Sequence, residues 1–532
     1  MIPRNPIASF RRPACALLLA AWPAPAWAQT GGNGGNAVAY SSGGDGGASG
    51  DGLAGGVGVA STVLPVNGGD GAAGSAIAIT ANSGTIQGGN GGSGAGGGGG
   101  GGAGLGGGGG GGDGGGAGGG GGGAGYGGGG GGGGAAGGSG GGGGGVSGSI
   151  TVSANSGTIL GGNGGGGDRA SHTGNGGDGL GSGGNCINGS SSCGSGGSVS
   201  GAISLVNTGT VQGGDAVAGS AGLGGVGVRG ANVTVVNAGE IAGGTNGDGS
   251  QANAITFTGG TNSLELQAGS VINGNVSGSG ANTLIFGGAA DSSFDLSGIG
   301  AQYQDFSAFQ KTGASTWTLS NTTTAAGAWT VSAGTLLLTG SDSLMNASDV
   351  TVASGATLAT PSFLIPPYFW AAQNFSSLHN SGTVSLGAPL EVSHYAGGGA
   401  LATTADMSTG GGTTATLMTV ESSVSGVTTV NVVNTAASVV PTAGDGIDLI
   451  AAAPAPAGSF VLGSVTDAAG QPITGYSFEL KQVNSDWFLQ ITPLASPPPS
   501  TAAAVPALTP WALILLALLL AGGAAAGIRR YD

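Results

Sequence analysis

ISLVNTGTVQGG, residues 203–214, decides the fold because its pattern returns along the chain. Two apolar residues, two positions apart, precede Asn-x-Gly, and a further apolar residue precedes Gly-Gly. A pattern that returns in this way is typical of repeat proteins, in which each copy is one structural unit. The other clear copies are IAITANSGTIQGG (77–89), ITVSANSGTILGG (150–162) and VTVVNAGEIAGG (233–244), and degenerate copies lie around Gly269, Gly334 and Gly382.

Each copy predicts two short strands and two corners. Apolar residues at i and i+2 turn one strand face inward. Asn and Gly tolerate positive φ, so Asn-x-Gly predicts the first corner and Gly-Gly the second. One unit buries almost nothing alone, so we expect the units to stack as the parallel coils of an all-β solenoid. An antiparallel β-sandwich also accommodates short strands and turns, and it remains the alternative.

Glycine dominates residues 29–145, and the stretch 94–145 is nearly pure glycine. Glycine loses the most backbone entropy on ordering and has no side chain to bury. The region is therefore either a flexible linker or a stack of backbone-paired turns, and we expect the flexible form. Glycine-rich insertions between the early copies should leave the coil as surface loops.

Glycine thins after about residue 263, and the apolar pattern becomes regular. The pattern runs through Phe309, Lys311, Gly313, Trp317, Leu319, Trp329, Val331, Gly334, Leu336 and Leu338. This run, with F-x-K-x-G before W-x-L and V-x-x-G-x-L strands, resembles the passenger-associated repeat of autotransporters. The resemblance implies a right-handed parallel β-helix.

The last body segment, 381–493, carries alternating aromatic residues. They include Tyr395, Phe460, Tyr476, Phe478, Trp487 and Phe488. The segment resembles the C-terminal part of a pertactin-like passenger, which implies a β-helix whose last strands cap its open end. Autotransporters continue into a transmembrane barrel, which we do not expect in the 39 residues after Pro493.

The N-terminus reads as a secretory signal. A positive region precedes a short apolar run, which Pro23 and Pro25 interrupt, and an A-x-A site follows. The interruption makes an anchor helix the weaker interpretation. We predict cleavage after Ala26-Trp27-Ala28, ahead of Gln29.

The C-terminus carries a second apolar segment. Residues 511–528 are uncharged and would be about 27 Å long as a helix, enough to span a bilayer core. Arg529 and Arg530 follow directly, so the positive-inside rule puts the C-terminus in the cytoplasm and the body outside. We predict one transmembrane helix; the alternative, a buried core helix, rarely abuts an arginine pair.

The same segment resembles the IPTL-type C-terminal sorting signal, related to the PEP-type tails that exosortase-like membrane proteases process. The resemblance implies membrane retention, then processing and delivery to the surface or release. This copy has Val505 in place of isoleucine and Ala507 in place of threonine. The residues that carry the resemblance are Val505, Pro506, Leu508, Trp511, Arg529 and Arg530.

Charge and motif content argue against two classes of function, nucleic-acid binding and catalysis. Nine Lys and Arg stand against 24 Asp and Glu, for a net charge of −15. Nucleic-acid binding requires clustered cations and is excluded, because the body keeps only Arg169, Arg229, Lys311 and Lys481. Nucleophile elbows, H-E-x-x-H and G-K-[ST] motifs are absent, so we do not expect an enzyme. The three histidines, His172, His379 and His394, are scattered.

Cys186 and Cys193 predict a local disulfide in an oxidising compartment, since two thiols make only half a zinc shell. We expect no cofactor. Calcium is the minority alternative, because two stretches fit the nonapeptide of calcium β-rolls without tandem copies. Their matching residues are Gly31, Gly32, Gly34, Asn36 and Val38, and then Gly174, Gly176, Asp178 and Leu180.

The predicted organisation is a signal peptide (1–28), a glycine-rich region (29–145), a repeat solenoid (146–380), a pertactin-like cap (381–493), a Pro/Ala-rich linker (494–504) and the sorting segment (505–532). We expect an exported cell-surface structural or adhesin-like protein, membrane-anchored at least transiently. Its expected partners are the membrane, a sorting protease, and host or matrix ligands. A β-helix carbohydrate-active enzyme and a purely structural matrix protein are the alternatives.

Overall fold

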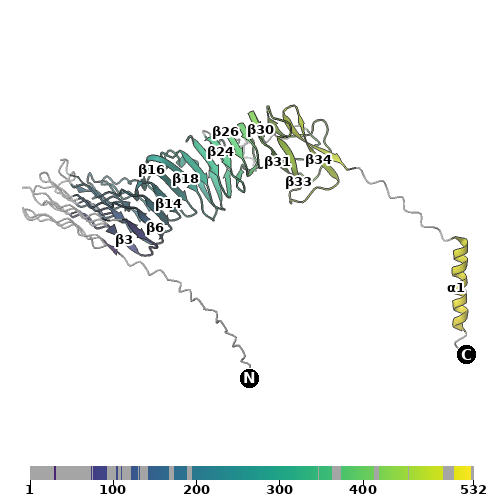
Figure 1. Ribbon diagram of the computed structural model, residues 1–532, viewed down its shortest axis with the longest axis horizontal. Helices are drawn as coiled ribbons and strands as arrows, with labels where there is room; N and C mark the ends of the chain where they lie inside the picture. Colours follow the sequence, from purple (N-terminus) through teal and green to yellow (C-terminus); the bar gives the residue numbers. More distant parts are fainter. Residues whose placement is uncertain are drawn as a thin grey trace, which may run out of the picture.

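The computed structural model shows an elongated body of stacked strands, which follow one another in sequence order from β3 (Thr85–Gln87) to β34 (Tyr476–Val483) (Figure 1). The structure describes residues 29–30, 74, 76–92, 104–105, 109–110, 121–126, 128–129, 131, 142–166, 173–187, 194–344, 347–361, 373–411, 418–452, 454–494 and 509–528.

Three sheets run along the body, and nearly all their strands pair in parallel. The N-terminal short sheet contains β1 (Gln29–Thr30), β3 (Thr85–Gln87), β7 (Thr158–Leu160), β12 (Thr210–Gln212), β15 (Glu240–Ala242) and β17 (Val271–Asn273). The C-terminal short sheet contains β19 (Ser292–Asp295), β21 (Thr316–Ser320), β23 (Thr335–Leu338), β25 (Thr357–Ala359), β27 (Thr383–Ser385), β29 (Ala400–Ala405), β31 (Thr428–Asn434) and β33 (Phe460–Thr466).

The long sheet accompanies both short sheets. Its main strands are β2 (Ile77–Ile79), β6 (Ile150–Asn155), β11 (Ile203–Asn207), β14 (Val233–Asn237), β16 (Ile255–Leu266), β18 (Val276–Phe286), β20 (Ala308–Lys311), β22 (Gly327–Val331), β24 (Ala347–Val352), β26 (Gln373–Asn380), β28 (Leu390–Ala396), β30 (Met418–Ser425) and β32 (Ile447–Ala452). Six more strands join it, namely β4 (Gly104–Leu105), β5 (Gly125–Tyr126), β9 (Leu180–Gly181), β13 (Val228–Ala231), β34 (Tyr476–Val483) and β35 (Asp486–Pro493). β8 (Thr173–Gly174) and β10 (Cys186–Ile187) pair separately, and Leu296–Gly298 is a short 3-10 helix.

Equivalent residues of successive copies pair in register. Ile203 faces Ile150 on one side and Val233 on the other, and all three side chains are fully buried. The same holds on the N-terminal short sheet, where Val211 lies between Ile159 and Ile241. This parallel stacking fits a β-helix and rules out the antiparallel sandwich for the repeat region.

The conserved spacing of asparagine in the copies produces a buried column of side-chain amides. Asn82 Nδ2 donates to Asn155 Oδ1 (2.8 Å), Asn155 to Asn207 (2.7 Å) and Asn207 to Asn237 (2.8 Å). The column ends where Asn237 donates to Ser270 Oγ (2.6 Å). The four amides are at most 1% exposed, so their hydrogen bonds form in a low-dielectric interior, where they are strongest.

Our explanation of the Asn-x-Gly corners was wrong in these copies. None of the column asparagines, nor the glycines two residues later, is among the residues with positive φ. Instead Asn207 Oδ1 accepts from the Gly209 amide (3.3 Å), which is an Asx turn. Glycine is required at Gly209 because a Cβ there would lie 2.1 Å from the carbonyl oxygen of Gly157 in the preceding coil. Positive φ does explain the later corners at Gly269, Gly313 and Gly334.

The glycine-rich loops pack through their backbones. Three neighbouring segments, 162–165, 182–185 and 223–226, surround the segment 174–179. Successive backbone N–H groups of 174–179 donate to these three segments in turn, so residues three apart donate to the same segment. A three-residue period is that of an extended polyproline-II-like chain, whose N–H groups all point away from its own axis. The six bonds are Gly174 to Gly165 (2.8 Å), Asn175 to Asn185 (2.7 Å), Gly176 to Leu223 (2.9 Å), Gly177 to Gly162 (2.8 Å), Asp178 to Ser182 (2.8 Å) and Gly179 to Val226 (2.8 Å).

This packing leaves no space for a side chain at several of the glycines. A Cβ at Gly174 would lie 1.7 Å from the Gly131 carbonyl oxygen, and one at Gly164 would lie 1.9 Å from that of Gly174. Parts of the glycine-rich region take part, since Gly122 N donates to Gly184 O (2.9 Å). These described glycines show backbone pairing, which was the alternative to the flexible linker that we expected. The undescribed parts of 29–145 leave that expectation untested.

Aromatic side chains fill the middle of the body and its C-terminal end. Phe309 and Trp329 stack on adjacent strands with centroids 4.5 Å apart. At the end, β34 (Tyr476–Val483) and β35 (Asp486–Pro493) form an antiparallel hairpin, and β35 pairs antiparallel with β32. Trp487 from β35 is buried against Phe460. The hairpin therefore ends the parallel stacking, as the aromatic pattern predicted.

The C-terminal segment contains an α-helix, α1 (Pro510–Ile528). Side chains are described as far as Ala521, and most of them are exposed, with Trp511 at 76%. Within the described part of the chain, no helix meets the length and apolarity needed to cross a membrane.

Candidate functional site

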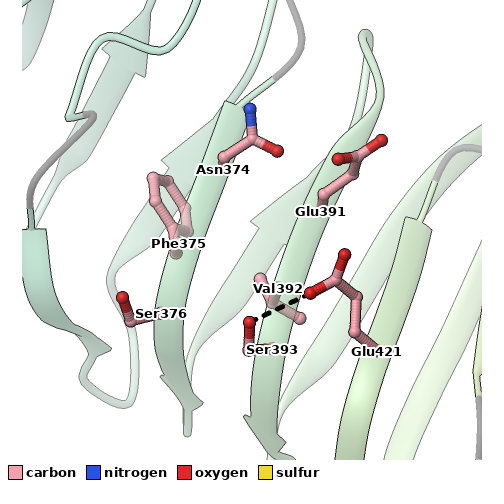
Figure 2. Close-up of a pocket in the computed structure, with 7 residues that line it drawn as sticks. All are labelled: Asn374, Phe375, Ser376, Glu391, Val392, Ser393 and Glu421. Carbon is pink, nitrogen blue, oxygen red and sulfur yellow. Dashed lines mark hydrogen bonds between the residues drawn. The ribbon is translucent and has the colours of Figure 1, made fainter.

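A carboxylate-lined groove crosses three neighbouring strands of the long sheet, β26, β28 and β30. We call it the carboxylate groove. Its cavity has a volume of about 180 Å³. Figure 2 shows the carboxylates of Glu391 and Glu421 side by side on adjacent strands, with Ser393 beneath Glu421. The lining residues are Asn374, Phe375, Ser376, Glu391, Val392, Ser393 and Glu421.

Strand register and a β-bulge position the polar side chains. Asn374 pairs with Glu391 between β26 and β28. Between β28 and β30, Val392 pairs with Val420 but His394 pairs with Ser423, so β30 has one extra residue there. Such a bulge redirects a side chain, and Glu421 lies within it. Ser393 Oγ then donates to Glu421 Oε2 (3.1 Å).

The groove is rich in hydrogen-bond acceptors. Two carboxylates and a serine hydroxyl line it. The side-chain Nδ2 of Asn374 donates a hydrogen bond to Asp342 Oδ1. Neighbouring strands lie about 4.8 Å apart, so these groups form one polar row across the sheet. The arrangement can accept hydrogen bonds from a hydroxyl-rich ligand.

Sequence reasoning did not single out Glu391 and Glu421. They are 30 residues apart and share no motif, and the bulge that brings them together has no sequence signal of its own. The one signal in the sequence was a charged residue between two apolar ones, Leu390-Glu391-Val392, which indicates that Glu391 points outward.

The histidines that the structure describes lie on the same outer face. His394 Nδ1 is 2.9 Å from Ser423 Oγ, and His379 Nε2 is 3.2 Å from Ser377 Oγ. Among the described residues, neither histidine has a carboxylate bonded to its other ring nitrogen, which a Ser-His-Asp triad requires. His172 lies outside the described residues.

Calcium binding at the two nonapeptide-like stretches remains a prediction. Asp178 is buried, and its carboxylate accepts from the Ser182 and Val226 amides (both 2.8 Å) and from Arg229 Nε (3.0 Å). Burial raises the pKa of Asp178, against the lowering effect of Arg229. No three His, Cys, Asp or Glu side chains come together in the described ranges. The other calcium-like stretch, residues 31–38, lies outside them.

Other predicted site residues are described only in part. Cys186 is buried and disulfide-bonded, whereas its predicted partner Cys193 lies outside the described residues. Gln29 begins β1, which pairs in parallel with β3, but Ala26 and Ala28 are not described. Trp511 lies in α1, while Val505, Pro506, Leu508, Arg529 and Arg530 fall outside the described ranges.

Two family models match the chain. The passenger-associated-transport-repeat matches residues 309–338, and the IPTL-CTERM motif matches residues 503–530. The chain is an autotransporter-passenger-like protein with an IPTL C-terminal sorting signal. These matches indicate an exported, surface-associated protein. No curated protein and no solved structure matches it.

The geometry of the passenger-associated repeat explains its motif residues. Lys311 is fully buried, and its ammonium donates to the carbonyls of Thr312 (2.5 Å), Gly313 (3.0 Å) and Ala333 (3.2 Å). Burial lowers the pKa of Lys311. Gly313 has φ +67, which permits the turn under the lysine. The F-x-K-x-G motif of this passenger-like chain thus joins two coils at a corner.

Proposed function

We propose that this passenger-like protein is displayed at the cell surface, where its right-handed β-helix serves as an adhesive or structural rod without catalysis. The observation that carries the proposal is the in-register stacking of coils from β2 to β32, which presents side chains at regular intervals along an extended surface. The carboxylate groove is a concave part of that surface, and we place ligand contact there.

The route to the surface follows from the two ends. A signal peptide cleaved before Gln29 would free the first residues to pair as β1 with β3. Residues 511–528 are uncharged, and we propose that they insert as a membrane helix with Arg529 and Arg530 on the cytoplasmic side. An exosortase-like protease would then process the sorting segment.

Fractionation and mass measurement test this route. Cells expressing the full chain with a tag in the body are separated, and the mature ends of the surface-released protein are determined by mass spectrometry. We expect an N-terminus at Gln29 and loss of the Tyr531–Asp532 end. Replacing Pro506 and Trp511 by alanine should keep the intact tail in the membrane fraction. An intact tail on surface-released wild-type protein would refute the sorting proposal.

The adhesive role is tested separately by solid-phase binding to matrix components. The variant Glu391→Gln/Glu421→Gln removes both charges of the groove, and Glu479→Gln, at an exposed position of β34 away from the groove, is the matched control. Loss of binding in the groove variant alone supports ligand contact there. Unchanged binding in both variants contradicts it.

A carbohydrate-active enzyme is the second candidate, favoured by the paired carboxylates in the groove. Glycoside hydrolysis uses two carboxylates as acid and as base or nucleophile. Incubating the purified chain with a panel of polysaccharides and measuring new reducing ends tests this candidate. Hydrolysis that disappears in Glu391→Gln and in Glu421→Gln would replace the non-catalytic proposal.

A further inference from the structure

A second concavity lies among the glycine-rich loops, far along the sequence from the carboxylate groove. Its volume is about 280 Å³, and six of its twelve lining residues are glycines. The other lining residues are one apolar residue, Leu223, and five polar or charged ones, Asn175, Asp178, Ser182, Asn185 and Arg229. We call it the amide hollow. Because glycines offer no side chain, the five polar and charged side chains supply the polar groups that could bind a ligand.

The two asparagine amides have a fixed orientation. Asn175 Oδ1 accepts from the Leu223 amide (2.8 Å), and Asn185 Oδ1 accepts from the Gly196 amide (2.6 Å). With each oxygen bonded to backbone, the NH₂ group of each side chain is the part left to donate. Neither NH₂ group bonds to another residue that the structure describes. The hollow therefore presents two preset donors.

Arg229 supplies the third donor group. Its Nε donates to Asp178 Oδ2 (3.0 Å), and the arginine side chain is 38% exposed whereas the aspartate is 4% exposed. The backbone amides of Ser182 and Val226 hold the same carboxylate in place. Asp178 thus anchors the guanidinium through Nε, and the two terminal nitrogens remain at the exposed edge. This planar edge matches a carboxylate in bidentate geometry.

We propose that the amide hollow binds a uronic-acid unit of an acidic polysaccharide. The carboxylate lies against Arg229, and Asn175 and Asn185 donate to the oxygen atoms of the same sugar. The volume is slightly below the range of roughly 300–1,000 Å³ for pockets that enclose drug-sized ligands, which suits a single sugar unit of a longer chain. The inference rests on the proposed surface role and names a ligand class for it.

The test uses the purified full chain and calorimetric titration with oligogalacturonate. Asn175→Asp and Asn185→Asp keep the oxygen that accepts the backbone amide but replace the donor with a negatively charged oxygen. Asn163→Asp is the matched control, because Asn163 Oδ1 accepts the Asp215 amide in the same way (2.8 Å) and lies outside the hollow. Arg229→Lys keeps the charge beside Asp178 and removes the planar edge.

We expect saturable binding, weakened at least tenfold in Asn175→Asp, Asn185→Asp and Arg229→Lys and unchanged in Asn163→Asp. No binding, equal binding of the uncharged galactose oligomer, or equal binding of a sulfated oligomer would overturn the assignment. So would wild-type affinity in the Asn175→Asp, Asn185→Asp and Arg229→Lys variants. The measurement needs no cells, so failed surface delivery and failed ligand binding give different results.

Discussion

Asn155 Nδ2 donates to Asn207 Oδ1 over 2.7 Å and so joins two coils that are 52 residues apart in the sequence. Asn155 also accepts from Asn82, and Asn207 donates onward to Asn237. Each amide in this column is both donor and acceptor, so no single asparagine can be removed without costing its neighbours a hydrogen bond. The column fixes which residues face each other between coils.

Replacing Asn155 by alanine should therefore destabilise the protein. We expect a loss of about 1–3 kcal/mol in the free energy of unfolding, because two buried amides lose a partner. Ser153→Ala, at an exposed position of the same strand, is the control and should stay within about 0.5 kcal/mol. Urea denaturation of the two variants measures the difference. Equal stabilities would show that the column contributes nothing.

The glycine loops allow a matched pair of substitutions. Gly164→Ala places a Cβ 1.9 Å from the Gly174 carbonyl oxygen, whereas the nearest atom to a Cβ at Gly166 is Val217 Cγ2 at 4.0 Å. We expect Gly164→Ala to cost about 1–3 kcal/mol through overpacking and Gly166→Ala to be neutral or mildly stabilising. Amide hydrogen exchange in segment 174–179 reports the effect. Equal exchange in both variants would contradict the close backbone packing.

Two tryptophans of the passenger-associated repeat should respond differently to phenylalanine. Trp317 Nε1 donates to Gly287 O (2.9 Å), whereas Trp329 Nε1 is buried without a partner among the described residues. Trp317→Phe leaves a carbonyl unpaired, so we expect it to cost about 1 kcal/mol more than Trp329→Phe. Chemical denaturation ranks the two variants. The reverse order would mean that ring packing, not the hydrogen bond, decides.

Stability should fall in alkaline solution through Tyr303. Burial raises the pKa of Tyr303 from 10.0 to about 12. Because the folded-state pKa is the higher one, this contribution is fully present below pH 10 and is lost as the pH rises towards 12. The loss is roughly 3 kcal/mol at most. Denaturation at pH 9 and pH 11.5 should show a smaller drop for Tyr303→Phe; an equal drop would assign the effect to other groups.

The apolar pattern was sufficient to predict the stacking. Ile203, Leu205 and Val211 were identified as inward residues, and the structure buries all three. Their spacing alone determines which face of a short strand is apolar, and units that small must stack. The aromatic alternation in β34 and β35 likewise predicted strands that end the body. Local spacing carries this information because strand geometry has a period of two.

Other features depend on contacts between distant residues, which no local pattern records. The asparagines were assigned to turns, although their main role is to bond the next coil. The order in the glycine loops arises from three neighbouring segments at once, so glycine content alone suggested flexibility. The groove carboxylates Glu391 and Glu421 meet through a bulge in β30. In each case the missing information is the register between coils.

Cross-linking measures that register most directly. Ser204 and Thr234 face each other on the outer side of β11 and β14, while Val235 points into the core. The account predicts that Ser204→Cys/Thr234→Cys forms an intramolecular disulfide in the full chain and that Ser204→Cys/Val235→Cys does not. Rapid cross-linking of the second pair, or of neither, would contradict parallel coils stacked in this register.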